Sequence, residues 1–288
     1  MQKNKYLVVS PCGDKSELFK TDWIDTETHQ GRDFDLVLLY YHPEVKNQDA
    51  VSLADYFFHL KDYKYKMIYN LFTNIKPELL GQYDYFFFLD DDIKITQETI
   101  NRSFHIADLF KLLICQPSLT SDSFCSWPIL KNKAGSFLRF MGEVEVMAPI
   151  FSREALTKCL PSFVENDSSW GLDTIWTYLL KFPKDKIAVL DAVQMKHTNP
   201  VGEGELYAKL KHRHQQEWVS IQKKYGIKKH YFTEFSRLEW SNRKYNKLNY
   251  LKNKLSEKAL FAKQKFNDYG LKHRIKSRVS KVLNTPKS

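Results

Sequence analysis

The chain has 288 residues, 43% hydrophobic and 27% charged, which is enough for one large domain with an appendage and excludes a disordered polymer. The net charge of +10 is uneven, because residues 203–288 carry 22 Lys and Arg against 7 Asp and Glu, a net of +15 that leaves −5 for residues 1–202. No apolar run approaches the roughly 20 residues of a membrane-spanning helix, and the run before Pro11 is too short for a secretory signal.

Short apolar runs alternate with helical patterns along the chain. The first half of the pattern predicts strands at 5–10 and 35–41, a helix at 63–80 ended by Gly81, a strand at 83–89 and a helix from Thr96 to about 113. The second half predicts strands at 113–116 and 143–151, helices at 152–160 and 170–180, and a strand at 187–193. This alternation predicts an α/β sandwich on a mostly parallel sheet, where ligands bind beyond the carboxyl ends of the strands.

The apolar strand at 83–89 runs directly into Asp90, Asp91 and Asp92. The spacing predicts that Asp90 and Asp92 lie side by side with Asp91 turned away, and two converging carboxylates favour a cation between them. Mg²⁺ or Mn²⁺ accepts such oxygen ligands and completes its shell from a substrate diphosphate, whose departure it assists. The alternatives are a solvated acidic turn or a phosphatase-like metal site.

A second candidate group lies in the segment at 165–173, where Asp173 opens a predicted helix. The partial positive charge at a helix start keeps a carboxylate ionised, so Asp173 is a candidate general base, with Asp167 as a second catalytic carboxylate nearby. Trp170 and Gly171 offer an aromatic platform for a sugar and a bend close to the substrate. The alternative is that Asp173 only caps its helix and Trp170 fills the core.

His197 follows the strand predicted at 187–193. A neutral imidazole there can complete a metal shell started by the aspartates, although a single histidine is often only a surface or core residue. This position makes His197 a candidate metal ligand.

Taken together and in this order, these segments resemble the GT-A glycosyltransferases, and residues 1–202 are similar to the family known as domain of unknown function 707. The segments that carry the resemblance are YDYFFFLDDDI, ICQPSL, EVMAPIFSR, ENDSSWGLD and VLDAVQMKH. The resemblance implies a GT-A fold in which Asp90, Asp92 and His197 hold the metal. It also implies that Asp173 deprotonates an acceptor hydroxyl and that the transfer inverts the anomeric carbon.

Further residues are candidates for contact with substrate. Glu145 falls at a recurrent position of the family and is expected at the donor or acceptor sugar, with a structural hydrogen-bonding role as the alternative. Gly13, Asp14 and Lys15 follow the first strand and are expected to line the nucleotide pocket together with Asp91.

The basic extension over residues 203–288 holds two amphipathic patterns, formed by Leu248, Leu251, Leu255, Ala259, Ala262 and Phe266 and by Leu271, Ile275, Val279 and Leu283. Cationic amphipathic helices bind anionic membrane surfaces, and such docking would suit a lipid-linked acceptor. Alternatively these helices dock on residues 1–202 or dimerise. Nucleic acid is a third possibility on charge alone, but no nucleic-acid motif supports it.

The sequence thus predicts a catalytic domain at 1–202 that moves a sugar from a nucleoside-diphosphate donor to a hydroxyl of a surface glycan. Its rivals are a nucleotidyltransferase or metal-dependent hydrolase using the same aspartates, and a non-enzymatic adaptor for polyanions or membranes. Four cysteines without CxxC spacing suit a reducing cytoplasm, so the predicted location is cytoplasmic. If the basic extension binds membrane, one of the alternatives above, the protein would lie on the inner face of the membrane.

Overall fold

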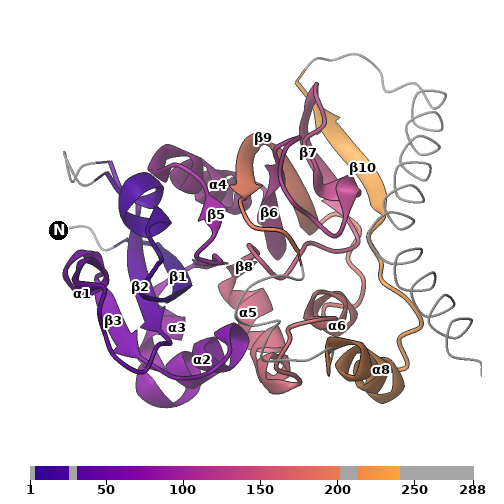
Figure 1. Cartoon of the computed structure of the whole chain (residues 1–288). Coiled ribbons are helices and arrows are strands. Elements are labelled where there is room, and N and C mark those ends of the chain that lie inside the picture. The colour runs from indigo at the N-terminus through magenta and orange to yellow at the C-terminus, as the bar shows by residue number, and fades with distance from the viewer. Residues whose placement is uncertain (1–3, 26–30, 202–212, 241–288) are drawn as a thin grey trace, which may run out of the picture. The chain divides into compact units, whose positions relative to one another are not determined.

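The computed structural model describes residues 4–25, 31–201 and 213–240. One mixed sheet forms the centre of this part, with the strand order β10-β7-β9-β6-β8-β4-β1-β2-β3, and β5 pairs with β9 off this path (Figure 1). The strands are β1 (Tyr6–Cys12), β2 (Phe34–Tyr40), β3 (Tyr56–His59), β4 (Tyr85–Phe88), β5 (Ile93–Lys94), β6 (Ile114–Leu119), β7 (Ser136–Met141), β8 (Ile150–Ser152), β9 (Ile187–His197) and β10 (Glu234–Glu239).

The sheet in the described residues is mixed, with four parallel and five antiparallel strand pairings, although most of its strands run in the same direction. The parallel pairs are β1 with β2, β1 with β4, β2 with β3, and β6 with β9. Strand β8 runs antiparallel to β4 and β6, and β7 runs antiparallel to β9 and β10. Parallel strands are covered on both faces, which explains why β1 and β4 are buried at every position. The predicted α/β sandwich is therefore confirmed.

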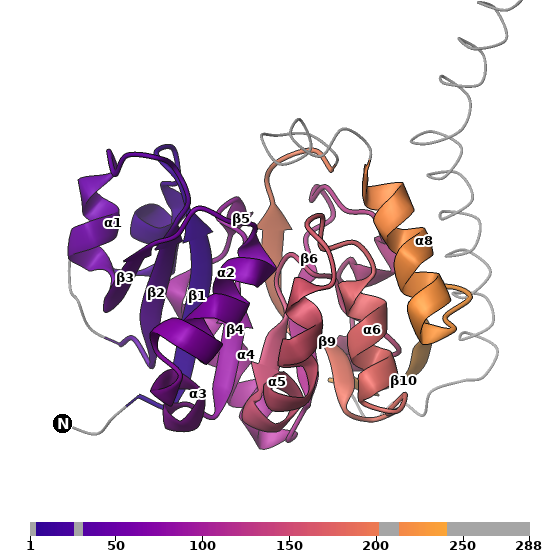
Figure 2. The same cartoon turned by 90° about the horizontal axis from the view of Figure 1, so that it is seen from below.

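Helices cover both faces of this sheet: α2, α3, α5 and α6 lie on one face and α4 lies on the other (Figures 1 and 2). The α-helices are α1 (Gln48–Leu53), α2 (Lys64–Asn70), α3 (Glu78–Gln82), α4 (Gln97–Leu109), α5 (Arg153–Cys159), α6 (Leu172–Leu179) and α8 (Arg213–Tyr225). Shorter turns are the π-helices η1 (Phe19–Trp23) and η2 (Leu71–Ile75) and the 3-10 helices η3 (Pro128–Leu130) and η4 (Leu160–Val164).

Two predicted helix starts are confirmed by their capping contacts. The Thr96 hydroxyl accepts a hydrogen bond from the Thr99 N–H at 3.2 Å at the start of α4, and the Ser152 hydroxyl accepts one from the Ala155 N–H at 3.2 Å at the start of α5. Such a contact satisfies one of the free amide groups at a helix start, so the local sequence alone fixes these two boundaries.

The single helix predicted at 63–80 is wrong in detail. The segment forms α2, the π-turn η2 and then α3, and Gly81 lies inside α3 rather than at a helix end. Pro77 is the cause, because a proline disfavours the helical conformation of the residue before it. Lys76 accordingly has φ −147° and ψ 62°, and a new helix begins after Pro77.

Two predicted strands also differ from the structure. Of the strand expected at 143–151 only Ile150–Ser152 forms, and residues 143–149 are a loop at the carboxyl edge of the sheet. The strand expected at 187–193 continues to His197, which is therefore the last residue of β9 rather than a loop residue. Both differences bring candidate site residues to the same edge.

The compact unit reaches beyond Gly202, where the composition placed the domain boundary. It comprises Met1–Cys125 and Leu130–Ser241, and β10 extends the sheet by pairing with β7. The second unit, Ser126–Ile129 with Asn242–Ser288, falls almost wholly outside the described residues, as do both amphipathic patterns of the basic extension. None of the helices in the described ranges has the length and apolar character needed to cross a bilayer.

Candidate functional site

Strand β4 delivers the three aspartates to the edge of the sheet. Phe86, Phe87, Phe88 and Leu89 have no exposed surface, because β4 lies between β1 and β8 and helices cover both faces. The chain leaves the sheet at Asp90, whose N–H donates to the Met147 carbonyl at 2.9 Å. Hydrophobic burial of β4 therefore fixes where the carboxylates emerge.

Asp90 pairs with a lysine that the sequence did not single out. The Lys64 ammonium at the start of α2 lies 2.7 Å from Asp90 Oδ1 and donates to the carbonyls of Phe88, Val146 and Met147 at 2.9, 3.0 and 3.0 Å. Burial raises the pKa of Asp90 and lowers the pKa of Lys64, although each partner favours the charged form of the other. Lys64 thus fixes Asp90 and ties β4 to the loop at 143–149.

Asp92 and the predicted ligand His197 are brought together. Strand β5 pairs with the end of β9, with Ile93 opposite His197, and this register places His197 Nε2 3.1 Å from Asp92 Oδ2. Asn199 donates to the same oxygen at 3.1 Å. Burial alone would raise the pKa of Asp92 and lower the pKa of His197. The polar contacts outweigh burial, so the pKa of Asp92 is lowered and the pKa of His197 is raised to about 9.

The remaining oxygen of Asp92 fits a cation. Asp92 Oδ1 is buried and accepts no hydrogen bond from any described residue. A buried carboxylate oxygen without a donor is costly unless another positive group satisfies it. Carboxylate oxygens are ligands that Mn²⁺ and Mg²⁺ accept, so Asp92 fits the predicted cation, and the role of His197 as a ligand stays a prediction.

Asp91 turns toward the loop after β1, away from Asp90 and Asp92. It accepts hydrogen bonds from the hydroxyls of Ser16 and, at 3.3 Å, Tyr41. Burial raises its pKa to about 6. The Gly13 N–H donates to the Ser16 hydroxyl at 2.8 Å, so Ser16 links the Gly13 loop to Asp91. That these residues line a nucleotide pocket stays a prediction.

The side chains of Tyr41 and His42 approach Gly13 closely. A Cβ atom at residue 13 would lie 2.5 Å from the Tyr41 hydroxyl. Asp14 accepts a hydrogen bond from Tyr40 and its N–H donates to His42 Nδ1 at 2.9 Å, whereas Lys15 is exposed. Asp14 therefore holds the loop in place.

The second predicted group also forms a defined structure. Gly171 is the N-cap residue of α6, with φ 85°, and Asp173 lies in the first turn of that helix. The cap is thus a glycine, and the alternative that Asp173 caps α6 is wrong. Its Oδ1 instead accepts from the Thr174 N–H at 2.9 Å.

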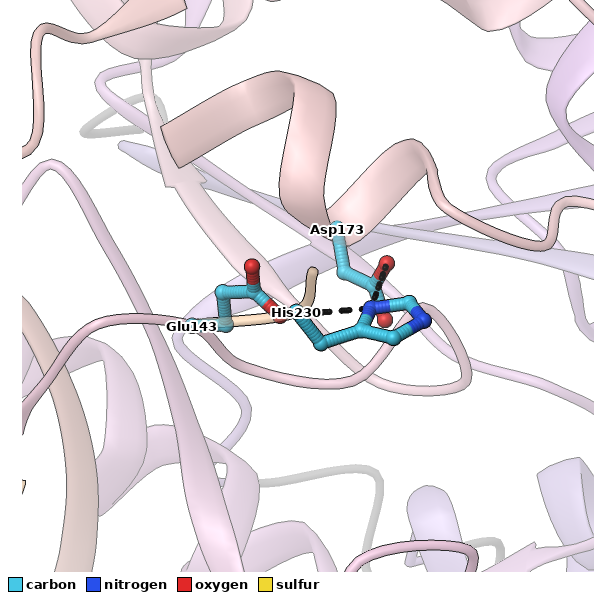
Figure 3. Close-up of side chains that lie close together, drawn as sticks. All are labelled: Glu143, Asp173 and His230. Atoms are coloured by element: carbon cyan, nitrogen blue, oxygen red, sulfur yellow. Dashed lines mark ion pairs between the residues drawn. The ribbon is translucent and has the colours of Figure 1, made fainter. Parts of the chain in front are cut away.

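Asp173 lies in a cluster with Glu143 and His230, neither of which was predicted (Figure 3). Their ligand atoms all lie within 4.8 Å of one another. His230 Nδ1 is 3.6 Å from Glu143 Oε2 and 4.0 Å from Asp173 Oδ1, and it is 2.7 Å from the Thr174 hydroxyl. The Tyr231 N–H donates to Glu143 Oε1 at 2.7 Å.

The cluster corrects the expectation that the helix start keeps Asp173 ionised. Burial, with the adjacent Glu143 as the next cause, raises the pKa of Asp173 to about 8, and burial also raises the pKa of Glu143 to about 8. The pKa of His230 is lowered by burial. Loss of solvent around two adjacent carboxyl groups outweighs the helix dipole, which is worth at most about 2 kcal/mol.

Asp167 and Trp170 lie beside this cluster but make other contacts. Asp167 forms ion pairs with Lys66 and, at 3.3 Å, with Arg213, and it is not part of the group formed by Glu143, Asp173 and His230. Trp170 is half-buried, and its ring lies 4.5 Å from that of His214 on α8. Its role as a sugar platform stays a prediction.

Glu145 lies in the loop at 143–149, two residues after Glu143. It is buried, and its N–H donates to Gln116 Oε1 at 2.6 Å. That Glu145 contacts a sugar, and that the aspartates after β4 form one site with Asp173, stay predictions.

Comparison with known proteins gives a family match. The model of a family described as a protein of unknown function (DUF707) matches residues 1–140 and 139–247. None of the curated proteins matches the chain.

Solved structures with a similar fold have low sequence identity to the chain. They include TarS of S. aureus, residues 1–349, with 13% identity, a TM-score of 0.42, and coverage of 66% of this chain and 59% of that chain. Glucosyl-3-phosphoglycerate synthase of Mycobacterium tuberculosis, in complex with Mn²⁺, UDP-glucose and phosphoglyceric acid, has 14% identity, a TM-score of 0.48, and coverage of 78% and 81%. The chain thus spans less than two thirds of the TarS fragment.

Proposed function

The chain belongs to the DUF707 family, and from its site we propose that it is a metal-dependent glycosyltransferase of the GT-A type. It transfers a sugar from a nucleoside-diphosphate donor to a hydroxyl of a glycan or lipid-linked acceptor. The observation that carries the proposal is the contact of His197 with Asp92, together with the buried Asp92 oxygen that no described residue satisfies.

In this proposal Asp90, Asp92 and His197 hold Mn²⁺ or Mg²⁺, and Lys64 orients Asp90 through their ion pair. When bound, the cation supplies positive charge for the leaving diphosphate. The Gly13 loop and Asp91, which Ser16 links by hydrogen bonds, bind the nucleotide in this proposal.

Asp173 is the proposed base for the acceptor hydroxyl. A carboxyl group with a pKa near the working pH is a better proton acceptor than an ordinary aspartate, and the pKa of Asp173 is raised to about 8 by burial. A single displacement assisted by this base inverts the anomeric carbon, and in this proposal Glu145 contacts the transferred sugar.

Replacing Asp92 tests the metal site. Thermal unfolding is measured with UDP, GDP, CDP or ADP, each with and without Mn²⁺. A ligand at about 100 times its Kd stabilises the folded state by about 2.7 kcal/mol. We expect one nucleotide to raise the melting temperature only with Mn²⁺, and we expect Asp92→Asn to lose that rise while keeping the melting temperature of the ligand-free protein.

The matched control is Asp122→Asn, which removes an exposed carboxylate that pairs with Lys196 and lies outside the site. This variant should keep the metal-dependent rise. An unchanged rise in Asp92→Asn would contradict the metal assignment.

Product analysis separates the enzymatic alternatives. Incubation with sugar nucleotides and a hydroxyl acceptor should release nucleoside diphosphate and give a glycosylated acceptor. Formation of a sugar nucleotide from a sugar phosphate and a nucleoside triphosphate would instead identify a nucleotidyltransferase, and release of free sugar alone would identify a hydrolase.

A further inference from the structure

The side chains of Glu143, Asp173 and His230 turn their polar atoms toward one another (Figure 3). One oxygen or nitrogen atom of each lies within 4.8 Å of those of the other two, and His230 Nδ1 is 3.6 Å from Glu143 Oε2 and 4.0 Å from Asp173 Oδ1. Zn²⁺ binds such atoms at roughly 2.0–2.2 Å, so atoms bound to one ion lie roughly 3–4 Å apart. The cluster therefore has the dimensions of a metal site.

Glu143 Oε2 is the atom in the cluster that needs a partner. The side chain of Glu143 has no exposed surface, and Oε2 accepts no hydrogen bond from any residue in the described ranges. The other oxygen, Oε1, accepts from the Tyr231 N–H at 2.7 Å, which fixes the carboxylate with Oε2 facing the imidazole of His230. A buried carboxylate oxygen costs free energy unless a donor or a cation satisfies it. A cation in the cluster would satisfy Oε2 directly.

The imidazole of His230 is held in a fixed orientation. The ring of Trp218 on α8 stacks on it at a centroid distance of 4.2 Å and an interplanar angle of 11°. The Thr174 hydroxyl lies 2.7 Å from Nδ1 and adds a fourth polar atom to the group. Contacts that orient a ligand strengthen metal binding. The side chain of His230 is 21% exposed, so a solvated ion can reach the cluster from this side.

The ligand types indicate which kind of ion the cluster prefers. Two carboxylates and one imidazole suit a transition metal, and the general order of affinities places Zn²⁺ above Mn²⁺ at a site of this kind. The cluster shares no residue with the Mn²⁺ or Mg²⁺ site proposed at Asp92 and His197, where a substrate diphosphate completes the shell. Here the Thr174 hydroxyl and water can do so, and binding therefore requires no nucleotide.

We propose that Glu143, Asp173 and His230 form a second cation site, which binds Zn²⁺ or a similar transition metal ion without a nucleotide and, when filled, stops sugar transfer. The inhibition follows because a carboxylate oxygen bonded to the ion cannot accept the proton of an acceptor hydroxyl. Metal binding is a property of the folded protein alone, whereas the inhibition rests on the proposed function, in which Asp173 is the base.

Calorimetric titration with ZnCl₂, in the absence of nucleotide, tests the binding. The starting protein is Asp92→Asn, which weakens the first metal site. We expect this protein to bind Zn²⁺, and we expect Glu143→Gln and His230→Gln, each added to Asp92→Asn, to weaken that binding at least about tenfold. Glutamine keeps the size of Glu143 and an oxygen for the Tyr231 N–H, and His230→Gln alters a partly exposed side chain, so the second variant still tests the site if the first disturbs the fold.

The matched control is His105→Gln, added to the same Asp92→Asn protein. His105 on α4 forms an exposed pair with Asp33, with His105 Nε2 2.9 Å from Asp33 Oδ2, and thus offers Zn²⁺ an imidazole and a carboxylate at the surface. Removal of this pair should leave the Zn²⁺ affinity unchanged. The melting temperature of each variant without metal shows whether it is folded.

The inhibition is measured as sugar transfer at saturating Mn²⁺ with increasing Zn²⁺, and each protein is compared with its own rate without zinc. The wild-type protein should lose most of its rate, and Glu143→Gln should need about tenfold more Zn²⁺ for the same fractional loss. Displacement of Mn²⁺ from the first site would inhibit both proteins alike. Equal sensitivity of the two proteins would therefore overturn the inhibitory role.

Two further outcomes separate this inference from the proposed function. Failure of Asp92→Asn to bind Zn²⁺, or binding that neither Glu143→Gln nor His230→Gln weakens, would overturn the second site and would mean that the cluster is satisfied without a metal. Zn²⁺ binding that both variants weaken, with no sugar transfer by the wild-type protein, would refute the proposed function while the second site stands.

Discussion

At the scale of single residues, Gly171 couples the candidate base to α8. Its φ of 85° is a conformation that favours glycine, and a Cβ atom at this position would lie 2.5 Å from Trp218 Cε3. The same Trp218 ring stacks on His230. One small residue thus permits both the start of α6 and the cover over the acidic cluster.

The two effects of Gly171 can be measured separately. Gly171→Ala should lower the free energy of unfolding by about 2–4 kcal/mol in urea denaturation, because backbone strain and overpacking against Trp218 both contribute. Gly135 has a similar φ of 84°, and a Cβ atom there would meet no other atom within 4 Å, so Gly135→Ala isolates the strain and should cost about 1 kcal/mol. Equal losses would show that Trp218 does not approach Gly171 closely.

Some residues of the candidate site can be predicted from the sequence, and others cannot. Asp90 and Asp92 are predictable because a buried apolar strand has to end where charged side chains follow it, which places them at the edge of the sheet. His197 is predictable from its place after another strand. Lys64, Glu143 and His230 carry no such local signal, since a buried charge is defined by partners distant in sequence. His230 lies in a basic segment where a histidine looks like any surface residue.

At the scale of secondary structure, an ion pair joins β7 to β9. Arg139 Nε lies 2.8 Å from Asp191 Oδ2, a second contact to Oδ1 measures 3.1 Å, and neither side chain has exposed surface. This two-point contact fixes β7 beside β9, and β10 then pairs with β7. Such a buried pair serves register more than net stability.

Breaking this pair should be costly. Asp191→Asn leaves the Arg139 charge buried without its partner and should lower the free energy of unfolding by about 3–5 kcal/mol in urea denaturation. Asp84→Asn breaks a half-exposed pair with Arg153 and should cost less than about 1 kcal/mol. Similar small losses in both variants would mean that solvent reaches Arg139.

Elements with a strong local pattern were predictable, and the others depend on tertiary contacts. Helices α4 and α5 begin where Thr96 and Ser152 can cap them. Strands β3 and β7 were missed because β3 is a short strand at the end of the strand order with no buried residue, and β7 follows a segment without periodicity. The alternation at 143–151 indicated a strand, but most of that segment has no neighbouring strand to pair with.

At the scale of the whole molecule, composition placed the domain boundary too early. The change to basic residues near 203 reflects surface charge, whereas α8 and β10 contribute buried residues such as Ile221 and Glu234. The family match likewise continues to residue 247. Charge patterning therefore does not mark the end of the compact unit.

Truncation tests this boundary. A chain ending at Ser241 should keep the melting temperature of the full chain but lose the binding to anionic vesicles that we propose for the basic residues beyond it. A chain ending at Gly202 lacks β10, α8 and the Tyr231 N–H that holds Glu143, and should melt roughly 10 °C lower. A chain ending at Gly202 that melts like the full chain would restore the earlier boundary.

The late position of His230 and β10 has a consequence for synthesis. A ribosome releases the chain from its N-terminus, so the aspartates after β4 emerge long before Trp218 and His230. The nascent protein can fold much of its sheet while Glu143 and Asp173 still face water. The acidic pair gains its contacts with His230 and Tyr231 only when that later segment packs beside it.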